Sequence, residues 1–184
     1  AGDALLTHTF ELLTHPDLTR HFPPTTLLSV INEIAQAAGC FGMIGGQVVD
    51  MESEGQQVDL QTIEYIHTHK TAALIRVSVR SGGVLAGGNG EEVAALTAYG
   101  ENIGLAFQII DDILDIKGEQ ERLGKQPGSD ISRHKATFPA VVGLEESTRR
   151  AREALDRALS ALEIFGERGE TLRELARFIV EREF

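Results

Sequence analysis

The sequence predicts an all-α fold. Apolar residues recur every three and four positions, which is the spacing of one face of a helix. The periodic stretches are too long for strands, and the alternating pattern of a strand is almost absent. Glycine and proline separate the stretches, as expected where helices end. The chain of 184 residues is long enough for one domain with a substantial core.

The first half of the chain is predicted to contain three long helices. The first occupies residues 1–15 and ends there because Pro16 disfavours helix before it. The second is expected to be a single helix over residues 27–49. Its middle is crowded with glycine and alanine, which we interpret mainly as close packing against a neighbouring helix. The third begins after Asp59, a predicted N-cap, and extends to about residue 84.

The second half is predicted to contain four helices, at residues 91–116, 138–143, 145–165 and 172–183. Glu91 and Glu92 suit the positive end of the first of these helices. Thr171 and Glu174 form a capping-box pattern for the last. Residues 118–134 lack clear periodicity, and a loop of that length is usually functional or disordered.

Composition excludes several classes of protein. Lys and Arg total 17 against 28 Asp and Glu, so the formal net charge is −11, which argues against a nucleic-acid partner. A single cysteine, Cys40, cannot form an internal disulfide and indicates a reducing compartment. Without an apolar run of roughly 18 to 20 residues, we expect no stable membrane insertion and a cytoplasmic location. The chain opens within a helical pattern and lacks a lead-in, so we expect it to be part of a longer protein.

A stripe of acidic residues is the most informative feature. Gln108, Asp111, Asp112 and Asp115 fall within an arc of about 100° on one helix, while leucine, isoleucine and phenylalanine cover most of the remaining circumference. A buried helix with several carboxylates requires counter-charge from outside it. Hard oxygen ligands of this kind suit Mg²⁺, which shares its coordination with substrate phosphates. The alternative is a stripe that simply faces water.

The segment after the stripe is basic in an acidic chain. Residues 117–135 carry three acidic residues against five basic ones, Lys117, Arg122, Lys125, Arg133 and Lys135. Together with Gly124-Lys125 and Gly128-Ser129-Asp130, this composition suits a flexible clamp on phosphate oxygens, although a solvated loop is the alternative. Lys70 with Thr71 is a second cationic candidate, which could equally be a surface lysine.

Taken together, these motifs resemble the trans-isoprenyl diphosphate synthase family, and most closely its bacterial farnesyl and geranylgeranyl diphosphate synthases. The resemblance covers most of the chain. It rests on Ala1-Gly2-Asp3-Ala4-Leu5-Leu6, Gly45-Gly46-Gln47-Val48-Val49-Asp50, His69-Lys70-Thr71, residues 107–115, Gly124-Lys125 to Asp130, and Lys135-Ala136-Thr137-Phe138-Pro139.

The resemblance implies an antiparallel helical bundle of the isoprenoid synthase type, normally a homodimer. It also implies a Mg²⁺-dependent enzyme that condenses isopentenyl diphosphate with an allylic diphosphate. By matching position, Asp111 and Asp115 are expected to bind Mg²⁺, and Asp112 to be a ligand or a support for the ligands.

The resemblance assigns the remaining candidate residues to the substrate. The expected diphosphate-binding residues are Lys70, Lys125 and Lys135. Thr71 and Gln108 are expected beside the reacting carbons, with Phe107 facing the cation through its ring. The implied catalytic group is therefore Lys70, Thr71, Gln108 and Asp111.

The chain departs from the family in one respect. Members carry two aspartate-rich motifs on facing helices, and only the second occurs in this sequence. We therefore expect residues 1–184 to be the C-terminal part of one isoprenyl diphosphate synthase domain, with N-terminal helices missing. Residues 1–184 alone are expected to bind Mg²⁺–diphosphate weakly and to turn over no substrate.

Three alternatives remain open. The chain could be a non-catalytic subunit that modifies a prenyltransferase partner. It could be a related terpene cyclase, although the Lys70-Thr71 and Lys135 to Pro139 motifs favour chain elongation. It could also be a di-iron helical bundle, because Glu64 and His67 have the required spacing; without a second such pair, both are more simply surface residues.

Overall fold

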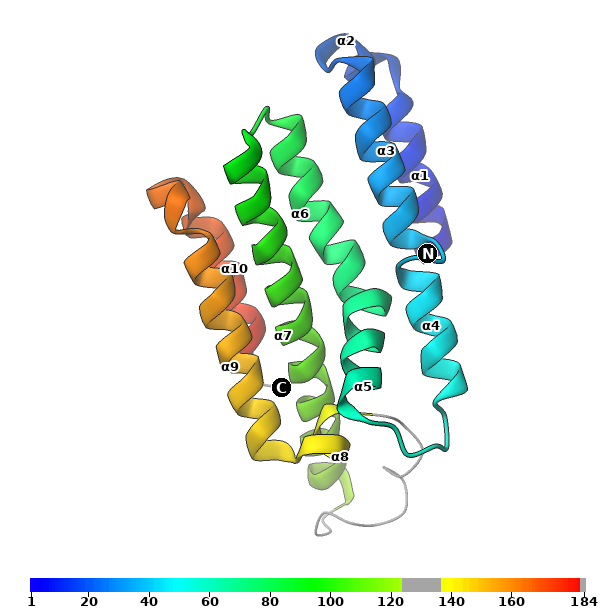
Figure 1. The fold of residues 1–184 in the computed structure, drawn as a ribbon, viewed down its shortest axis with the longest axis vertical. Helices are drawn as coiled ribbons and strands as arrows, with labels where there is room; N and C mark the ends of the chain where they lie inside the picture. Colours follow the sequence, from blue (N-terminus) through cyan, green and yellow to red (C-terminus); the bar gives the residue numbers. More distant parts are fainter. Residues whose placement is uncertain (124–136, 183–184) are drawn as a thin grey trace.

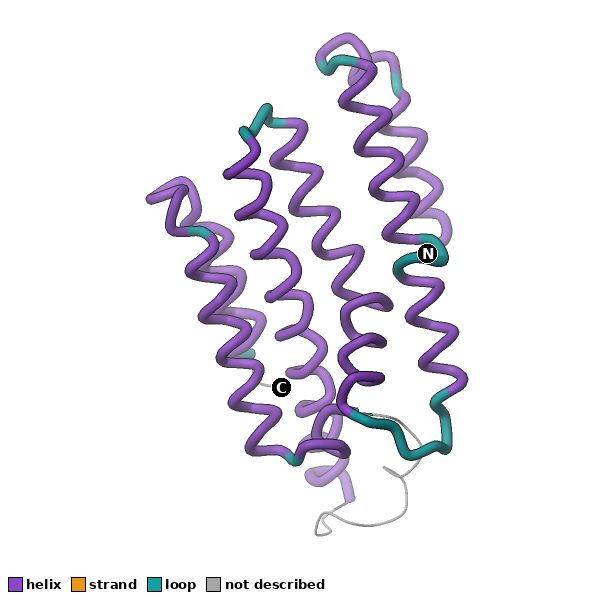
Figure 2. The backbone as a smooth tube through the Cα atoms, viewed as in Figure 1, coloured by secondary structure: helices purple, strands orange, loops and turns teal. Residues whose placement is uncertain are grey.

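The computed structural model describes the backbone of residues 1–123 and 137–182, and the side chains of residues 1–116 and 137–182. All regular structure in these residues is helical, as predicted (Figures 1 and 2). In chain order the helices are α1 (Gly2–Thr14), α2 (Pro16–His21), α3 (Pro24–Ala38), α4 (Met43–Glu52), α5 (Leu60–Ile66), the π-helix η1 (His67–Ala72), α6 (Ala73–Leu85), α7 (Gly90–Leu123), α8 (Phe138–Val142), α9 (Leu144–Ala161), the 3₁₀-helix η3 (Glu163–Gly169) and α10 (Glu170–Glu181).

Helix α7 is the centre of the bundle. It packs against α6 and η1 on one side and against α9 and α10 on the other, while α3 packs against α6 and α4 against η1 (Figure 1). The buried residues along α7 include Tyr99, Ile103, Ala106 and Ile109, each at most 2% exposed. The helix that carries the aspartates is therefore held from both sides, which fixes where its polar residues point.

Helix α7 begins with a reciprocal cap. The side-chain oxygen of Asn89 accepts hydrogen bonds from the backbone N–H groups of Glu91 and Glu92, at 2.9 and 3.0 Å. In return, the Glu92 carboxylate accepts from the Asn89 N–H at 3.0 Å. The predicted placement of the two glutamates at a helix start is confirmed. The helix continues to Leu123, beyond the predicted end at residue 116.

The single helix predicted over residues 27–49 is wrong, because the chain breaks between α3 and α4 (Figure 2). The break is a tight turn at residues 39–42. A Cβ atom on Gly42 would lie only 2.1 Å from the Ala37 carbonyl oxygen, so this turn requires glycine. Glycine in this stretch therefore ends one helix as well as allowing close packing.

The predicted helix after Asp59 is confirmed at its start. The Asp59 carboxylate accepts from the Thr62 N–H at 2.8 Å, and the cap holds the pKa of Asp59 below its usual value, chiefly through this bond. The helical run continues to Leu85, but its middle is the π-helix η1. A π-helix contains an extra residue in one turn, and such turns occur frequently at functional sites.

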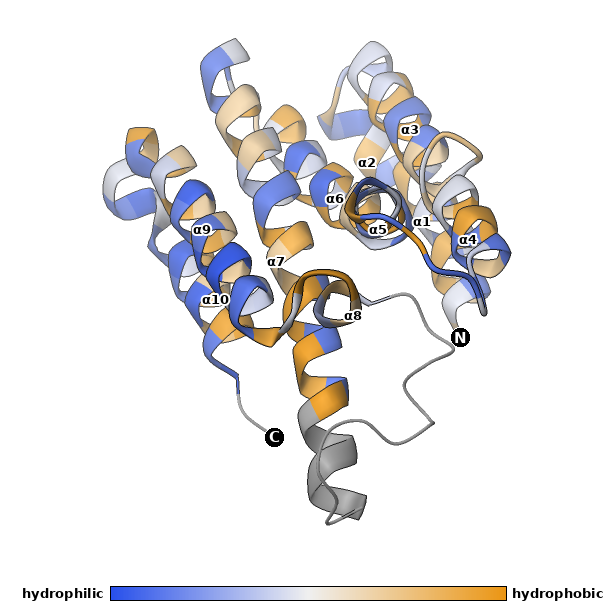
Figure 3. Ribbon diagram, turned by 60° about the horizontal axis from the view of Figure 1, so that its bottom comes forward, coloured by the Kyte–Doolittle hydropathy of each residue, from blue (hydrophilic) through white to orange (hydrophobic). Residues whose placement is uncertain are grey.

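The C-terminal helices differ from prediction in their boundaries. Helix α9 ends at Ala161 and is followed by η3, which the sequence pattern does not separate. Helix α10 begins after Gly169 with no side-chain cap, so the predicted capping box at Thr171 is wrong. Figure 3 shows α9 and α10 as largely hydrophilic ribbons beside the more hydrophobic α7. Their small buried residues, including Ala154 and Ala176, lie in the core cluster that also contains Tyr99.

By length and composition, two helical stretches could cross a membrane, Pro24–Glu52 and Gly90–Ile116. The expectation that no stretch reaches this length is therefore corrected. The core helix of a soluble protein meets the same criterion, and the first stretch includes the break between α3 and α4.

Candidate active site

The three aspartates of the stripe lie in three different environments. The Asp112 side chain is only 2% exposed, the Asp111 side chain is 35% exposed, and Asp115 lies at the surface. The stripe therefore does not simply face water. It extends from the core of the bundle to its outside within two turns of α7.

Asp112 is held by polar groups from two other elements. Its Oδ2 atom accepts a hydrogen bond from the backbone N–H of Phe138, the first residue of α8, at 2.9 Å. The same oxygen lies 3.2 Å from Nε2 of His67. Asp112 was expected either to bind the metal or to support the neighbouring aspartates that bind it. Because its side chain is buried and already bonded, the second role is favoured.

Asp111 is paired with Arg182, which follows the last turn of α10. The Arg182 guanidinium also lies over the ring of Phe107, with its central carbon 4.5 Å from the ring centroid. The counter-charge predicted to come from outside the helix therefore comes from the end of α10. Sequence reasoning did not single out Arg182, because nothing local distinguishes it from the surface arginines before it.

The local environment raises the pKa of Asp111 above its usual value. Burial is the largest cause, because it removes the carboxylate from water. The guanidinium of Arg182 opposes this effect, and the negative charges of Asp115 and Asp112 add to it. A cation close to Asp111 favours its charged form, as Arg182 does here.

Lys70 lies in the π-helix and forms a hydrogen bond with Asp50 of α4. Its ammonium donates a hydrogen bond to Oδ2 of Asp50 at 2.6 Å, and both side chains are partly buried. The contact depends on a close approach, because a Cβ atom on Gly46 would lie 2.3 Å from the Lys70 backbone nitrogen. The predicted tight packing of the glycine-rich helix is therefore confirmed at Gly46.

The candidate residues Lys70, Thr71, Phe107, Gln108 and Asp111 lie on two elements that are in contact, η1 and α7. A Cβ atom on Gly104 of α7 would lie 2.6 Å from the Ala72 side chain, so the two elements are in close contact. Thr71 is half-buried on η1, and Phe107 and Gln108 are half-buried on α7. Two further candidates, Lys125 and Lys135, lie outside the described residues.

The di-iron alternative is not supported by the contacts of its two proposed ligands. Glu64 pairs with Arg150 of α9 at 2.9 Å, whereas His67 contacts Asp112. The expectation that His67 is a surface residue is wrong, because it is 4% exposed. Sequence spacing gave no sign of this, since the residue that buries His67 is 45 positions away.

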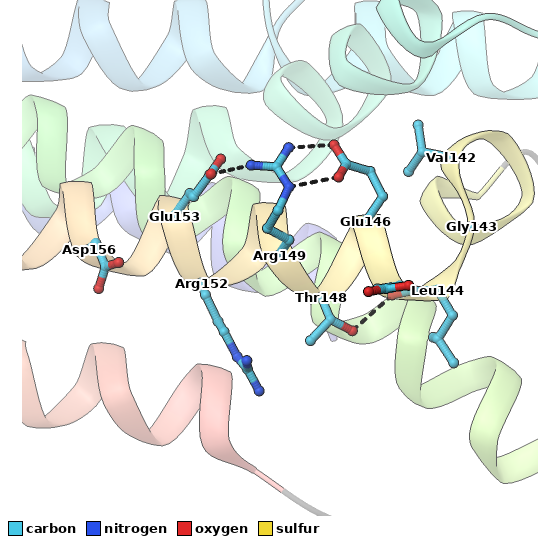
Figure 4. Close-up of a pocket in the computed structure, with 10 residues that line it drawn as sticks. Val142, Gly143, Leu144, Glu146, Thr148, Arg149, Arg152, Glu153 and Asp156 are labelled. Atoms are coloured by element: carbon cyan, nitrogen blue, oxygen red, sulfur yellow. Dashed lines mark hydrogen bonds and ion pairs between the residues drawn. The ribbon is translucent and has the colours of Figure 1, made fainter.

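Two cavities lie near α9. The larger, about 990 Å³, follows the outer face of α9, where Arg149 pairs with Glu146 and Glu153 (Figure 4). The paired charges of Arg149, Glu146 and Glu153 neutralise one another on this face. The smaller, about 560 Å³, lies between α7, α9 and α10 and is lined by apolar residues together with Thr148, Arg152, Glu181 and Arg182, the partner of Asp111. It is therefore adjacent to Asp111.

The donor set fits magnesium held together with a substrate. In residues 1–116 and 137–182, no three His, Cys, Asp or Glu side chains gather to enclose a metal. Mg²⁺ does not need such a cage, because it is commonly bound by one or two carboxylates plus substrate phosphates. Asp111 and Asp115 can supply those two carboxylates.

The all-helical bundle around an aspartate-bearing central helix defines the class of fold to which the chain belongs. Residues 1–173 match the sequence model of the Polyprenyl synthetase family, and the chain belongs to that family. It is 44% identical over 183 residues to a dimethylallyltranstransferase of Fischerella ambigua, and 42% identical over 186 residues to the farnesyl diphosphate synthase of Escherichia coli. Each alignment covers 99% of this chain but 52% and 62% of the relative, respectively.

Solved structures show the same relationship. A putative farnesyl-diphosphate synthase from Marinomonas sp. is 36% identical, with a TM-score of 0.81 over 97% of this chain and 60% of its own. A geranyltransferase from Helicobacter pylori, complexed with magnesium and isoprenyl diphosphate, is 31% identical. Its TM-score is 0.75 over 98% of this chain and 58% of its own. The isoprenoid synthase type of bundle implied by the sequence is confirmed.

Proposed function

We propose that this chain acts in a Mg²⁺-dependent prenyltransferase that condenses isopentenyl diphosphate with an allylic diphosphate. The product would be a short-chain polyprenyl diphosphate of the farnesyl or geranylgeranyl type. The observation that carries the proposal is Asp111, a partly buried carboxylate on an apolar helix, which lies beside Asp112 and Asp115 and pairs with Arg182. The magnesium and isoprenyl diphosphate bound to the Helicobacter pylori relative support it.

Each candidate residue has a defined part in this reaction. Asp111 and Asp115 would hold Mg²⁺, which when bound supplies positive charge to the departing diphosphate. Lys70, Lys125 and Lys135 would bind diphosphate oxygens as point charges. The Asp50 carboxylate orients the Lys70 ammonium before substrate arrives.

The reacting carbons would lie beside residues of both η1 and α7. Thr71 and Gln108 supply polar groups there, and the ring of Phe107 presents its π face. The contact between Phe107 and the Arg182 guanidinium supports this role, because it places a cation against that face. The apolar residues around the stripe exclude water, which would otherwise capture a carbocation.

The proposal extends to assembly and location. We propose a cytoplasmic homodimer, and we propose that residues 1–184 alone bind Mg²⁺–diphosphate weakly and turn over no substrate. The second point is supported by the sequence, which contains one of the two aspartate-rich motifs that the family uses. A non-catalytic subunit remains the alternative, and turnover by the protein expressed from its complete gene decides between them.

The test is a substitution of Asp111 in that protein. Asp111→Asn keeps the shape of the side chain and removes the charge. We expect turnover of labelled isopentenyl diphosphate to fall on the order of 100-fold with little loss of thermal stability. Asp156→Asn, on the outer face of α9, is the matched control. Unchanged turnover in Asp111→Asn would refute the assignment.

A further inference from the structure

His67 occupies an unusual position for a histidine. It is the first residue of the π-helix and is buried, three residues before Lys70. Its ring stacks on that of Phe138, with centroids 5.2 Å apart, and its Nε2 atom lies 3.2 Å from Oδ2 of Asp112. The roles proposed above do not use it.

The contact joins three elements at one oxygen atom. Oδ2 of Asp112, on α7, also accepts the hydrogen bond from the Phe138 N–H that begins α8. His67 approaches the same oxygen from η1. Three elements therefore meet at the Asp112 carboxylate. They are the helix that carries Asp111, the helix that carries Lys70, and the start of α8.

The chemistry of the contact determines where the proton lies. A carboxylate can only accept hydrogen bonds, so the contact is favourable when Nε2 of His67 carries a proton. Nδ1 of His67 is buried and has no hydrogen-bond partner among the described residues. A ring with its proton on Nε2 leaves Nδ1 as an acceptor, and an unpaired acceptor is tolerated better than an unpaired donor.

We propose that His67 is a positioning residue, whose Nε2–H holds the Asp112 carboxylate against the Phe138 amide and so fixes α7, η1 and α8 relative to one another. This inference rests on the proposed function. Asp112 is adjacent to Asp111, and His67 lies three residues before Lys70. The His67–Asp112 contact therefore sets the separation between the proposed metal ligand and the proposed diphosphate-binding lysine.

Three variants of the protein expressed from its complete gene separate positioning from packing. His67→Phe keeps a ring against Phe138 and removes the donor. His67→Asn places its amide near the position of Nδ1, whereas His67→Gln places its amide near the position of Nε2. His8→Phe, at an exposed histidine of α1, is the control for general effects of the substitution.

The first measurement is hydrogen exchange at the Phe138 backbone amide, which can be made whether or not the protein is catalytically active. We expect exchange to be about tenfold faster in His67→Phe and His67→Asn, and close to wild type in His67→Gln. The second measurement compares the change in kcat with the change in KM for each variant. We expect kcat to fall about 10- to 100-fold in the first two variants with a smaller change in KM, and His67→Gln to recover most of it.

The possible outcomes are distinguishable. Wild-type exchange at Phe138 together with wild-type kcat in His67→Phe would overturn the proposal, since the ring would then only fill space. A failure of His67→Gln to recover either quantity would also overturn it. If the wild-type protein itself condenses no prenyl substrates, the proposed function fails, while exchange at Phe138 and titration with Mg²⁺–pyrophosphate still test His67.

Discussion

Arg182 pairs with Asp111 and thereby connects the end of α10 to the aspartates of α7. Asp111 and Arg182 are 71 positions apart in sequence. The guanidinium neutralises a carboxylate that burial has partly removed from water, and its central carbon lies over the Phe107 ring. One arginine therefore covers both the proposed metal ligand and the aromatic ring beside it.

Arg182→Met should raise the pKa of Asp111 further. The guanidinium is the main influence that lowers this pKa, so its removal leaves the effect of burial unopposed. Carboxyl carbon chemical shifts measured against pH will show the direction. Arg177→Met, which removes a partner of Glu170 at the surface, is the control and should leave Asp111 unchanged. An unaltered Asp111 titration in Arg182→Met would show that the pair does not form in solution.

Gly46→Ala should destabilise the fold by about 1 to 3 kcal/mol or more in free energy of unfolding. The added Cβ atom would lie 2.3 and 2.8 Å from backbone atoms of Lys70, which cannot move cheaply. Gly82→Ala is the matched control, because its Cβ atom meets no other atom within 4 Å. That variant should gain up to about 1 kcal/mol from its better helix propensity. Urea unfolding of both variants tests the pair, and equal stabilities would contradict the close approach of α4 to η1.

Deprotonation of Tyr99 should lower the free energy of unfolding at high pH. Burial raises the pKa of Tyr99 from 10.0 to about 12, and its hydroxyl donates to the Leu172 carbonyl at 2.8 Å. Between these pH values the unfolded chain binds fewer protons than the folded one. The contribution of Tyr99 is therefore complete below pH 10 and is lost as the pH rises through about 12. A two-unit shift corresponds to roughly 2 to 3 kcal/mol.

The check on this prediction is the variant Tyr99→Phe. Stability measured by chemical unfolding from pH 9 to 12 should depend less on pH in the variant than in the wild type. At neutral pH the variant should lose about 1 kcal/mol with its hydrogen bond. If both proteins lose stability in parallel above pH 10, Tyr99 is not the source.

The sequence was sufficient for those parts of the fold that depend on local patterns. Helical periodicity gave the fold class, and the caps at Asp59 and at the glutamates after Asn89 are local hydrogen bonds between near neighbours. The break at Gly42 was missed because glycine permits both close packing and a tight turn. The two roles of glycine differ only in which atoms occupy the space where a Cβ atom would lie. At Gly42 that space is occupied by the Ala37 carbonyl.

The parts of the site that were missed depend on contacts between distant residues. The spacing of the aspartates placed them on one face of a helix, but could not show that Asp112 points to the core and Asp111 to a charged partner. Both Arg182 and His67 resemble surface residues in their local sequence. Their partners become visible only when α10 and η1 pack against α7.

The extra residue in the π-helix has a consequence for how this region tolerates insertions and deletions. Losing one residue from His67–Ala72 would convert the wide turn to a regular one and leave α5 and α6 in their present rotation relative to each other, because the extra residue is taken up within that turn. Only side chains within the turn would change direction, and Lys70, which bonds to Asp50 from there, is one of them. A single-codon deletion here should therefore break the contact of Lys70 with Asp50 while leaving the packing of the flanking helices in place, and the wide turn can be gained or lost only as a whole.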